Sequence, residues 1–362
     1  MIRSGPLLRR CPAMVDHRGR AGDDLRALPG KAARMRKSPT IADQTGKATS
    51  LSRIKKRLVE AAAQIGQDEP EELTFNHSCL CQCGLPATRP KPEVLLWEVR
   101  QGRAKLSVAA GRVIDPRTRE FIQLGLPYGP KSRLLLMHLN SEAIRRQSPV
   151  IPVEDSMTAF FRRLMGRTQD GRQANMLKIQ LSALAAAHFR IGVVYDDERA
   201  VQMNSQLVAA FDLWFPSEPG QRVLWPSTLR LSLDYFDSLT KYAVPLDERA
   251  IAALAHSAIA LDMYCWLAQR LHRIPEGRPQ FVPWAALHEQ FGQGYTRVRK
   301  FREFFFGLLH QVHAAYPDAK FEAKHMPIAE CRVIRSDWGH MAPMNPGDVP
   351  VIDGALRELL ES

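Results

Sequence analysis

The sequence has no long hydrophobic run. In its 362 residues, no apolar stretch approaches the roughly 20 residues that a helix needs to cross a bilayer. Met1 to Pro12 contains arginines but no sustained apolar segment, so it does not resemble a secretory signal. We therefore expect a soluble, cytoplasmic protein with no membrane partner.

Cysteine is scarce, with six residues in the whole chain. So few thiols in a chain of this length do not make a disulfide framework, and reduced thiols in a cytosol are the simplest interpretation. Cys79, Cys81 and Cys83 stand close together near His77, which suggests a metal site. However, this spacing lacks the usual two-residue spacer and no second cysteine pair follows, so we reject the metal site. The neighbouring leucines fit a buried segment.

A phosphate-binding loop is also missing. The segment from Gly125 to Ser132 imitates one, but only three residues separate its glycines. Pro130 removes a backbone N–H of the kind that binds phosphate in such loops. We predict no nucleotide, no other cofactor and no metal.

Cations are abundant, and the formal net charge is +12. This excess favours an anionic partner, but much of it lies in the first 67 residues and does not locate a binding face. Residues 1–46 show no apolar periodicity, and we expect a disordered basic arm there. The arm would add unspecific DNA affinity; an inert extension, an upstream start codon and a targeting peptide stay open as alternatives.

The stretch from Ser257 to Ser336 has the pattern of three helices followed by two short strands. Apolar residues recur at three- and four-residue steps in the segment Ala258 to Leu271, which predicts the first helix. A short strand at Phe281-Val282 precedes the second helix, and Pro283 suits that helix's first turn.

The third helix of this stretch combines an apolar stripe with a basic start. Its predicted core-facing residues are Val298, Phe301, Phe305, Leu308 and Val312. Its first turns carry Arg297, Arg299, Lys300 and Arg302. Three helices, the last one basic, followed by two strands is the order of a winged helix-turn-helix, whose basic helix fits the major groove of DNA. A solvated basic helix in another α-rich domain is an equal alternative.

A similar order of helices and strands occurs earlier in the chain, beginning at Arg133. The helix predicted over residues 172–187 turns Leu177, Leu181 and Leu184 inward. Its outward residues are Arg172, Gln173, Asn175, Lys178 and Ser182. A helix over residues 48–67 and a hairpin over residues 94–108 precede this repeat.

These patterns predict an α+β fold with two tandem winged helix-turn-helix domains and small antiparallel sheets. The basic arm covers residues 1–46. The first winged-helix domain, with its N-terminal helix and hairpin, covers residues 47–232, and the second covers 233–336. A flexible tail covers residues 337–362.

Two phrases of the sequence resemble the plasmid-encoded RepA replication initiator family. They are GLPYGPKSRLLLMHLNSEAIRRQSP from Gly125 to Pro149, and AIALDMYCWLAQRLHRI with FVPWAALHEQFGQGY between Ala258 and Tyr295. The likeness covers about Ala48 to Ser336. It implies an initiator that binds repeated sequences in double-stranded plasmid origin DNA, opens the duplex with the host initiator's help and recruits the host helicase.

The resemblance also implies a homodimer and a location with the plasmid or nucleoid in a bacterial cytoplasm. Related initiators are built from two winged-helix domains, and they often exchange between a dimer that represses its own promoter and a monomer that binds the origin. No base-contacting residues are carried over from the family.

The candidate DNA-binding residues therefore follow from helical faces. They are Arg172, Gln173, Asn175 and Lys178 in the first domain, Arg297, Arg299, Lys300 and Arg302 in the second, and Lys324 and His325 at the predicted wing tip. Cations replace counterions on phosphates, and an Arg at guanine or an amide at adenine discriminates bases by about 1–3 kcal/mol. A solvated turn is the equal alternative for the wing tip. Trp266 and Trp284 are predicted core residues.

Three other functions compete with this interpretation. A winged-helix transcriptional regulator without an initiation role binds one palindrome instead of an array of repeats. A rolling-circle nicking initiator is an enzyme that needs a tyrosine nucleophile and a metal held by paired histidines, and the sequence contains no His-x-His pair. We therefore predict no catalytic residues. A scaffold protein would not distinguish specific from random duplexes.

Overall fold

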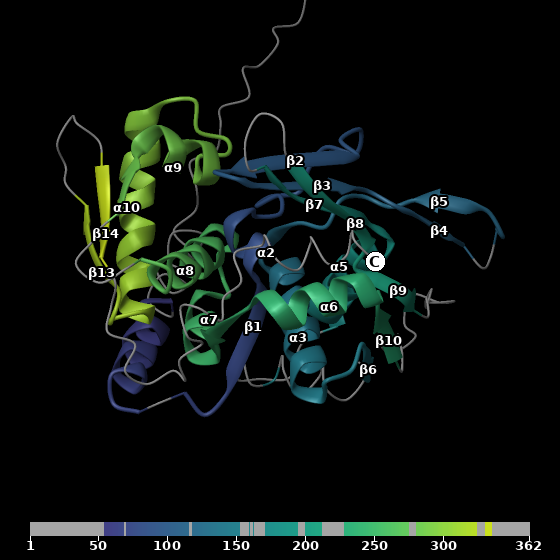
Figure 1. Ribbon diagram of the computed structural model, residues 1–362, viewed down its shortest axis with the longest axis horizontal. Helices are drawn as coiled ribbons and strands as arrows, with labels where there is room; N and C mark the ends of the chain where they lie inside the picture. Colours follow the sequence, from purple (N-terminus) through teal and green to yellow (C-terminus); the bar gives the residue numbers. More distant parts are fainter. Residues whose placement is uncertain are drawn as a thin grey trace, which may run out of the picture. The chain divides into compact units, whose positions relative to one another are not determined.

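Helices and small antiparallel sheets alternate along the chain (Figure 1). The computed structural model describes residues 54–68, 70–115, 118–152, 171–194, 200–211, 228–274, 280–323 and 330–334, with 159 and 162 as single positions. The arm predicted over residues 1–46, the tail 337–362, and the wing-tip residues Lys324 and His325 lie outside these ranges. The mixture of helices with small antiparallel sheets confirms the α+β prediction.

The first described elements join distant parts of the sequence. After a helix over residues 54–65, β1 (Leu73–His77) pairs antiparallel with β11 (Ala243–Asp247). The short helix α2 (Ser78–Gln82) begins at His77, whose Nδ1 accepts a hydrogen bond from the Cys79 backbone N–H at 3.1 Å. This bond satisfies one of the donors that a helix N-terminus leaves unpaired.

A four-stranded antiparallel sheet follows, in the order β2-β3-β7-β8. Its strands are β2 (Leu96–Gln101), β3 (Ala104–Ala109), β7 (His188–Val194) and β8 (Ala200–Gln206). The predicted hairpin is confirmed by the pairing of β2 with β3. Strand β5 (Phe121–Gln123) pairs with β4 (Arg112–Ile114) in a separate two-stranded sheet.

The first repeat begins with α3 (Gly129–Arg146). β6 (Val150–Pro152), α5 (Gly171–Ala186), β9 (Val208–Phe211) and β10 (Thr228–Leu231) follow. The strands form a three-stranded sheet in the order β6-β10-β9, so the last strand lies in the middle. Strand β7 follows α5 directly but pairs into the four-stranded sheet.

The second repeat has a sheet of the same strand order, but no strands of another sheet come between its last described helix and its last two strands. After α6 (Leu233–Tyr242) and α7 (Glu248–Leu254), it consists of α8 (Ala258–Leu271), β12 (Gln280–Pro283), α9 (Trp284–Phe291), α10 (Val298–Ala315), β13 (Lys320–Ala323) and β14 (Glu330–Ile334). Its sheet has the order β12-β14-β13, again with the last strand in the middle. Ser257 caps α8 through its hydroxyl, which accepts from the Ala260 N–H.

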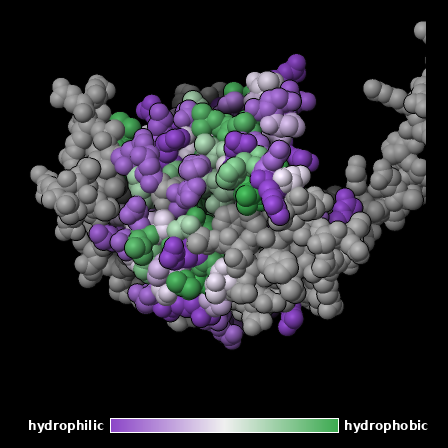
Figure 2. All heavy atoms as spheres, turned by 90° about the vertical axis from the view of Figure 1, so that its right-hand side faces the viewer, coloured by the Kyte–Doolittle hydropathy of each residue, from purple (hydrophilic) through white to green (hydrophobic). Residues whose placement is uncertain are grey.

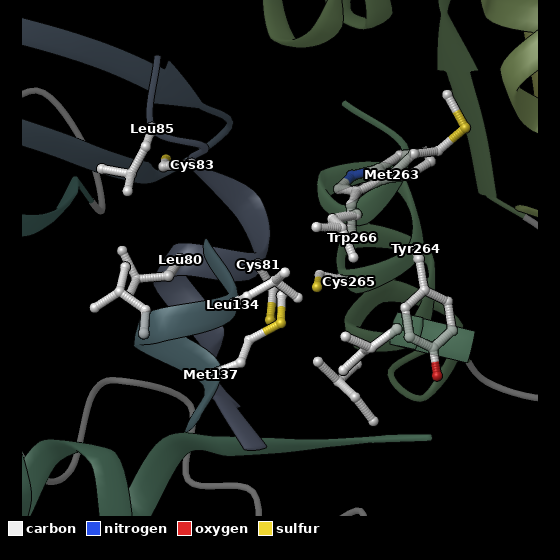
Figure 3. Close-up of a cluster of buried hydrophobic side chains, with 14 of the residues drawn as sticks. Leu80, Cys81, Cys83, Leu85, Leu134, Met137, Met263, Tyr264, Cys265 and Trp266 are labelled. Atoms are coloured by element: carbon white, nitrogen blue, oxygen red, sulfur yellow. The ribbon is translucent and has the colours of Figure 1, made fainter. Parts of the chain in front are cut away.

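One hydrophobic core connects the elements of both repeats. Figure 3 shows Leu80, Cys81 and Cys83 on one side of this core and Cys265 and Trp266 of α8 on the other, with α3 residues alongside. Cys79, Cys81, Cys83 and Cys265 are free and buried. Burial raises the pKa of the Cys81 thiol well above its usual value, so the thiol stays protonated and packs as a small apolar group.

A buried ion pair also connects the two repeats. The Arg133 guanidinium on α3 donates from Nε to Asp262 Oδ1 and from Nη2 to Asp262 Oδ2 on α8, each at 2.6 Å. Carbonyl oxygens of Leu85, Pro86 and Gly129 accept its remaining hydrogen bonds. The Arg133–Asp262 pair joins residues on opposite sides of the domain boundary predicted between residues 232 and 233. The position of that boundary stays a prediction.

The outside of the molecule mixes polar and apolar residues. Figure 2 shows one face, on which hydrophilic and hydrophobic residues are interspersed. No helix among the described residues is long and apolar enough to cross a membrane. The same residues contain no group of three or more His, Cys, Asp or Glu that could hold a metal ion.

Candidate nucleic-acid interface

The start of α10 presents a group of cations to solvent. The chain leaves α9 through Gly292 and Gly294, and Gly294 has a φ of +85°, a conformation that L side chains rarely adopt. Arg297 then occupies the N-cap position with an extended backbone. Arg297, Arg299 and Lys300 are exposed, and Arg299 lies 3.4 Å from Glu303 in an exposed pair. Screening by water makes such a pair weak, so it leaves Arg299 available to a stronger anion.

The opposite side of α10 is fixed in the core. Phe301, Phe305, Leu308 and Val312 are buried, as the helical spacing predicts. Trp284 of α9 lies edge-on to Phe305 at 5.4 Å between ring centroids, and it is buried like Trp266. The prediction that both tryptophans belong to the core is confirmed. The buried face holds the helix in place and leaves Arg297, Arg299 and Lys300 exposed.

Two residues of α10 differ from their expected positions. Val298, predicted to face the core, is 46% exposed because it lies at the very start of the helix, before the buried stripe begins. Arg302, predicted to face DNA, is half-buried, and its Cζ lies 4.9 Å from the ring centroid of Trp284. Its stem therefore contributes to packing, and its charge is drawn towards the ring face.

Helix α5 of the first repeat presents a different surface. Arg172 and Asn175 are exposed, whereas Gln173 and Lys178 are half-buried. Partial burial lowers the pKa of Lys178. Leu177, Leu181 and Leu184 are buried as predicted.

Sequence reasoning gave no role to Ile179, which is 47% exposed. It lies four residues after Asn175 and seven after Arg172, so the three residues share one face of α5. The sequence feature that could have identified Ile179 is that it is an apolar residue outside the leucine stripe of this helix. A face with a guanidinium, an amide and a branched apolar group has the chemistry that distinguishes guanine, adenine and the thymine methyl group.

The structure thus brings three of the predicted cations together at the start of α10, and it exposes two of the four predicted residues on α5, Arg172 and Asn175. Lys324 and His325 belong to residues that are not described. A cavity beside the Arg133–Asp262 pair has a volume of about 10 Å³, room for about one water molecule. That cavity is too small for a cofactor.

Comparisons with known proteins support the resemblance suggested by the sequence. Residues 126–285 match the family described as plasmid encoded RepA protein. The match confirms the predicted resemblance over the first repeat and the beginning of the second. No curated protein matches the chain.

Two solved structures resemble the chain. Both contain domains 2 and 3 of RctB, and one of them is a selenomethionine derivative. Each has 9% sequence identity and covers 72% of this chain, with TM-scores of 0.45 and 0.42. This chain covers 98% and 96% of the two RctB chains.

Proposed function

We propose that this protein is a replication initiator that binds double-stranded plasmid origin DNA through two winged-helix units. The observation that carries the proposal is the match of residues 126–285 to the plasmid encoded RepA family. The match spans all described elements of the first repeat, from α3 to β10, and extends into α9. It therefore covers the part of the chain that contains α5.

The topology of the repeats supports the winged-helix assignment. In each repeat a helix leads to a short edge strand, and a later helix precedes two strands that complete a three-stranded antiparallel sheet. In the first repeat, β7 and β8 of the four-stranded sheet come between this helix and the two strands. In such folds the helix before the last two strands lies in the major groove. That helix is α5 in the first repeat and α10 in the second.

Charge supports the same assignment. Cations at the first turn of a helix can contact phosphates while the buried face holds the helix against its domain. Arg297, Arg299 and Lys300 are exposed at the start of α10, which supports phosphate contacts there. On α5, the exposure of Arg172 and Asn175 supports contacts with base edges.

The test is a double substitution, Arg297→Gln with Lys300→Gln. Binding of a fluorescent duplex from the DNA flanking the protein's own gene is measured by anisotropy at several salt concentrations. Loss of two phosphate contacts should weaken binding roughly tenfold at moderate salt and lower the logarithmic salt slope by about 1.8. The thermal transition should stay nearly unchanged because both side chains are exposed.

The matched control is Arg89→Gln with Lys91→Gln. Both residues are exposed in the loop before β2, and their substitution removes as much positive charge as the α10 substitutions do. The control should bind like the wild type. Unchanged affinity of the α10 variant, or an equal loss in the control, would remove α10 as the DNA-contacting helix.

A winged-helix transcriptional regulator is the second candidate, because the same two repeats would serve either role. Footprinting of the protein on its flanking DNA separates them. An initiator should protect an array of short direct repeats, and a regulator should protect one palindrome. From the resemblance we further propose the host initiator and helicase as partners, and a homodimer in exchange with the monomer; sedimentation with and without DNA tests the exchange.

A further inference from the structure

We propose that the outer face of the four-stranded sheet is a second DNA-binding surface, which holds the phosphate backbone of duplex DNA beside the site contacted by α5. This inference rests on the proposed function. The inner face of the sheet is buried through Leu106, Phe189 and Ile191. The outer face is open to solvent. Most of its side chains are polar, several of them are cations, and the apolar Leu96 and Val194 lie exposed at the ends of its strands.

The cations of this face lie close together. Arg100 of β2 is directly opposite Lys105 of β3. Arg190 of β7 is opposite Ser107, and Arg103 lies in the turn between β2 and β3. All four cations are exposed, and the outward-facing acid on the described strands of this sheet is Glu98. The face therefore carries a positive excess.

The pairing of Arg100 opposite Lys105 across β2 and β3 destabilises the folded protein when no ligand is bound. Like charges directly opposite each other across two strands repel. Among the described residues, Arg103, Lys105 and Arg190 make no ion pair, and Arg100 makes one hydrogen bond, to the Gly102 carbonyl at 3.4 Å. A bound polyanion would relieve this repulsion by neutralising both cations.

A glycine interrupts the same face. Gly192 of β7 is paired with Lys105 on one side and with Gln202 of β8 on the other. A glycine inside a strand weakens the strand and often marks a place where a ligand or another backbone approaches closely. Because Gly192 has no side chain, the surface of the sheet is lower there, between Lys105 and Gln202.

The chemistry of the face selects duplex DNA as the occupant. Protein interfaces have an apolar or aromatic centre, whereas the centre of this face consists of Lys105, Ser107 and Arg190. Surfaces for single strands use aromatic side chains on which bases stack, and no phenylalanine, tyrosine or tryptophan is exposed on the outer face of the described strands of this sheet. Cations and amides without a row of such rings fit a phosphate backbone.

The sheet contact is distinct from the start of α5. The helix has 16 residues, which span roughly 24 Å. Strand β7 begins after α5 ends, with Ala187 between them. The far end of α5 therefore adjoins the sheet, while Arg172 and Asn175 lie nearer its start. The sheet would contact backbone beyond the bases contacted by α5.

The experiment compares two duplexes selected by the wild-type protein from a randomised pool. The short duplex contains only the enriched core, and the longer one adds flanking base pairs. Arg100→Gln with Lys105→Gln should bind the longer duplex roughly tenfold more weakly than the wild type at physiological salt, with a salt slope lower by about 1.8. Both proteins should bind the short duplex equally. Arg190→Gln, on a different strand, should show a smaller loss of the same kind.

The control is again Arg89→Gln with Lys91→Gln, which should bind both duplexes like the wild type. Equal affinity of the sheet variant and the wild type for the longer duplex overturns the inference and leaves the proposed function intact. The inference is also overturned if the control variant loses as much affinity for the longer duplex, or if the sheet variant loses affinity only for single-stranded DNA or for polyglutamate. If the wild type enriches no sequence and binds neither duplex, the proposed function fails and the inference fails with it.

Discussion

Arg133 shows how much of this fold depends on a single residue. Its side chain is 4% exposed, and it makes a two-bond ion pair with Asp262, which is 129 positions away in sequence. A guanidinium suits this place because its planar fork also reaches three backbone carbonyls. The sequence predicts that Arg133 begins a helical segment, but nothing local indicates its partner.

Removal of either charge should leave the other one unpaired in a largely apolar setting. Breaking a buried pair costs about 3–5 kcal/mol. The 18% exposure of Asp262 favours the lower end of this range. We expect Arg133→Met to lower the free energy of unfolding by about 3 kcal/mol in urea titrations.

A double-substitution cycle tests whether the pair itself is responsible. Arg133→Met with Asp262→Ala should be clearly more stable than the sum of the two single losses predicts, because neither charge is then left alone. Additive losses would mean that each side chain contributes through packing instead. The exposed pair of Lys56 with Glu60 provides a control cycle, in which we expect less than about 0.5 kcal/mol of coupling.

His77 is a second residue whose burial has a measurable consequence. Its Nδ1 accepts from the Cys79 N–H, and its Nε2 lies 3.0 Å from the Ser238 hydroxyl. Burial lowers the pKa of His77 from 6.5 to about 4. The neutral ring fits both contacts when Nε2 carries the proton and donates it to Ser238.

The lowered pKa makes stability depend on pH. Between 6.5 and about 4 the unfolded chain binds a proton at this histidine and the folded protein does not, so stability falls as pH falls through this window. The free energy of unfolding falls by about 3 kcal/mol in total across this pH window. His77→Asn keeps an N-cap acceptor and should flatten the dependence of the unfolding free energy on pH. The same slope in both proteins would assign the effect to other groups.

At the scale of elements, the sequence predicts helices better than sheet partners. The apolar stripes of α5 and α10 are local patterns, and their leucines and phenylalanines are buried where the spacing places them. The side a residue faces is less certain at a helix end, as Val298 shows. Strand pairing depends on contacts between distant residues, so the sequence predicts the local hairpin of β2 and β3 but not the place of β7 beside β3.

The end of α5 makes a close contact that can be tested. A Cβ atom on Gly111 would lie 1.7 Å from the carbonyl oxygen of Ala186. Backbone cannot yield as a flexible side chain can, so Gly111→Ala should shift the end of α5 or the start of β4. We expect a loss of about 1–3 kcal/mol in thermal or urea unfolding.

Gly125→Ala is the matched control for this prediction. A Cβ atom at Gly125 would meet no atom within 4 Å. The change should therefore be neutral or slightly stabilising, since alanine restricts the unfolded chain. Equal losses at the two positions would contradict the close approach of Gly111 to α5.

At the scale of the whole molecule, the two predicted domains share too many contacts to be expected to unfold separately. β1 pairs with β11 along its full length, and the Gln290 side chain donates to the Gln82 carbonyl at 2.9 Å. The Arg133–Asp262 pair adds an ionic contact, and one core contains residues of α2, α3 and α8. Each of these contacts joins residues on opposite sides of the boundary predicted at 232/233.

We therefore expect one cooperative transition for the full chain. Circular dichroism of the helices and intrinsic tryptophan fluorescence should give coincident urea curves, because the loss of either repeat exposes the core of the other. Arg133→Met should move both curves by the same amount. A chain of residues 47–232 lacks β11 and α8, so it should show no cooperative transition by itself. Two separate transitions in the full chain, or a cooperative transition in that fragment, would instead establish two independently stable winged-helix domains.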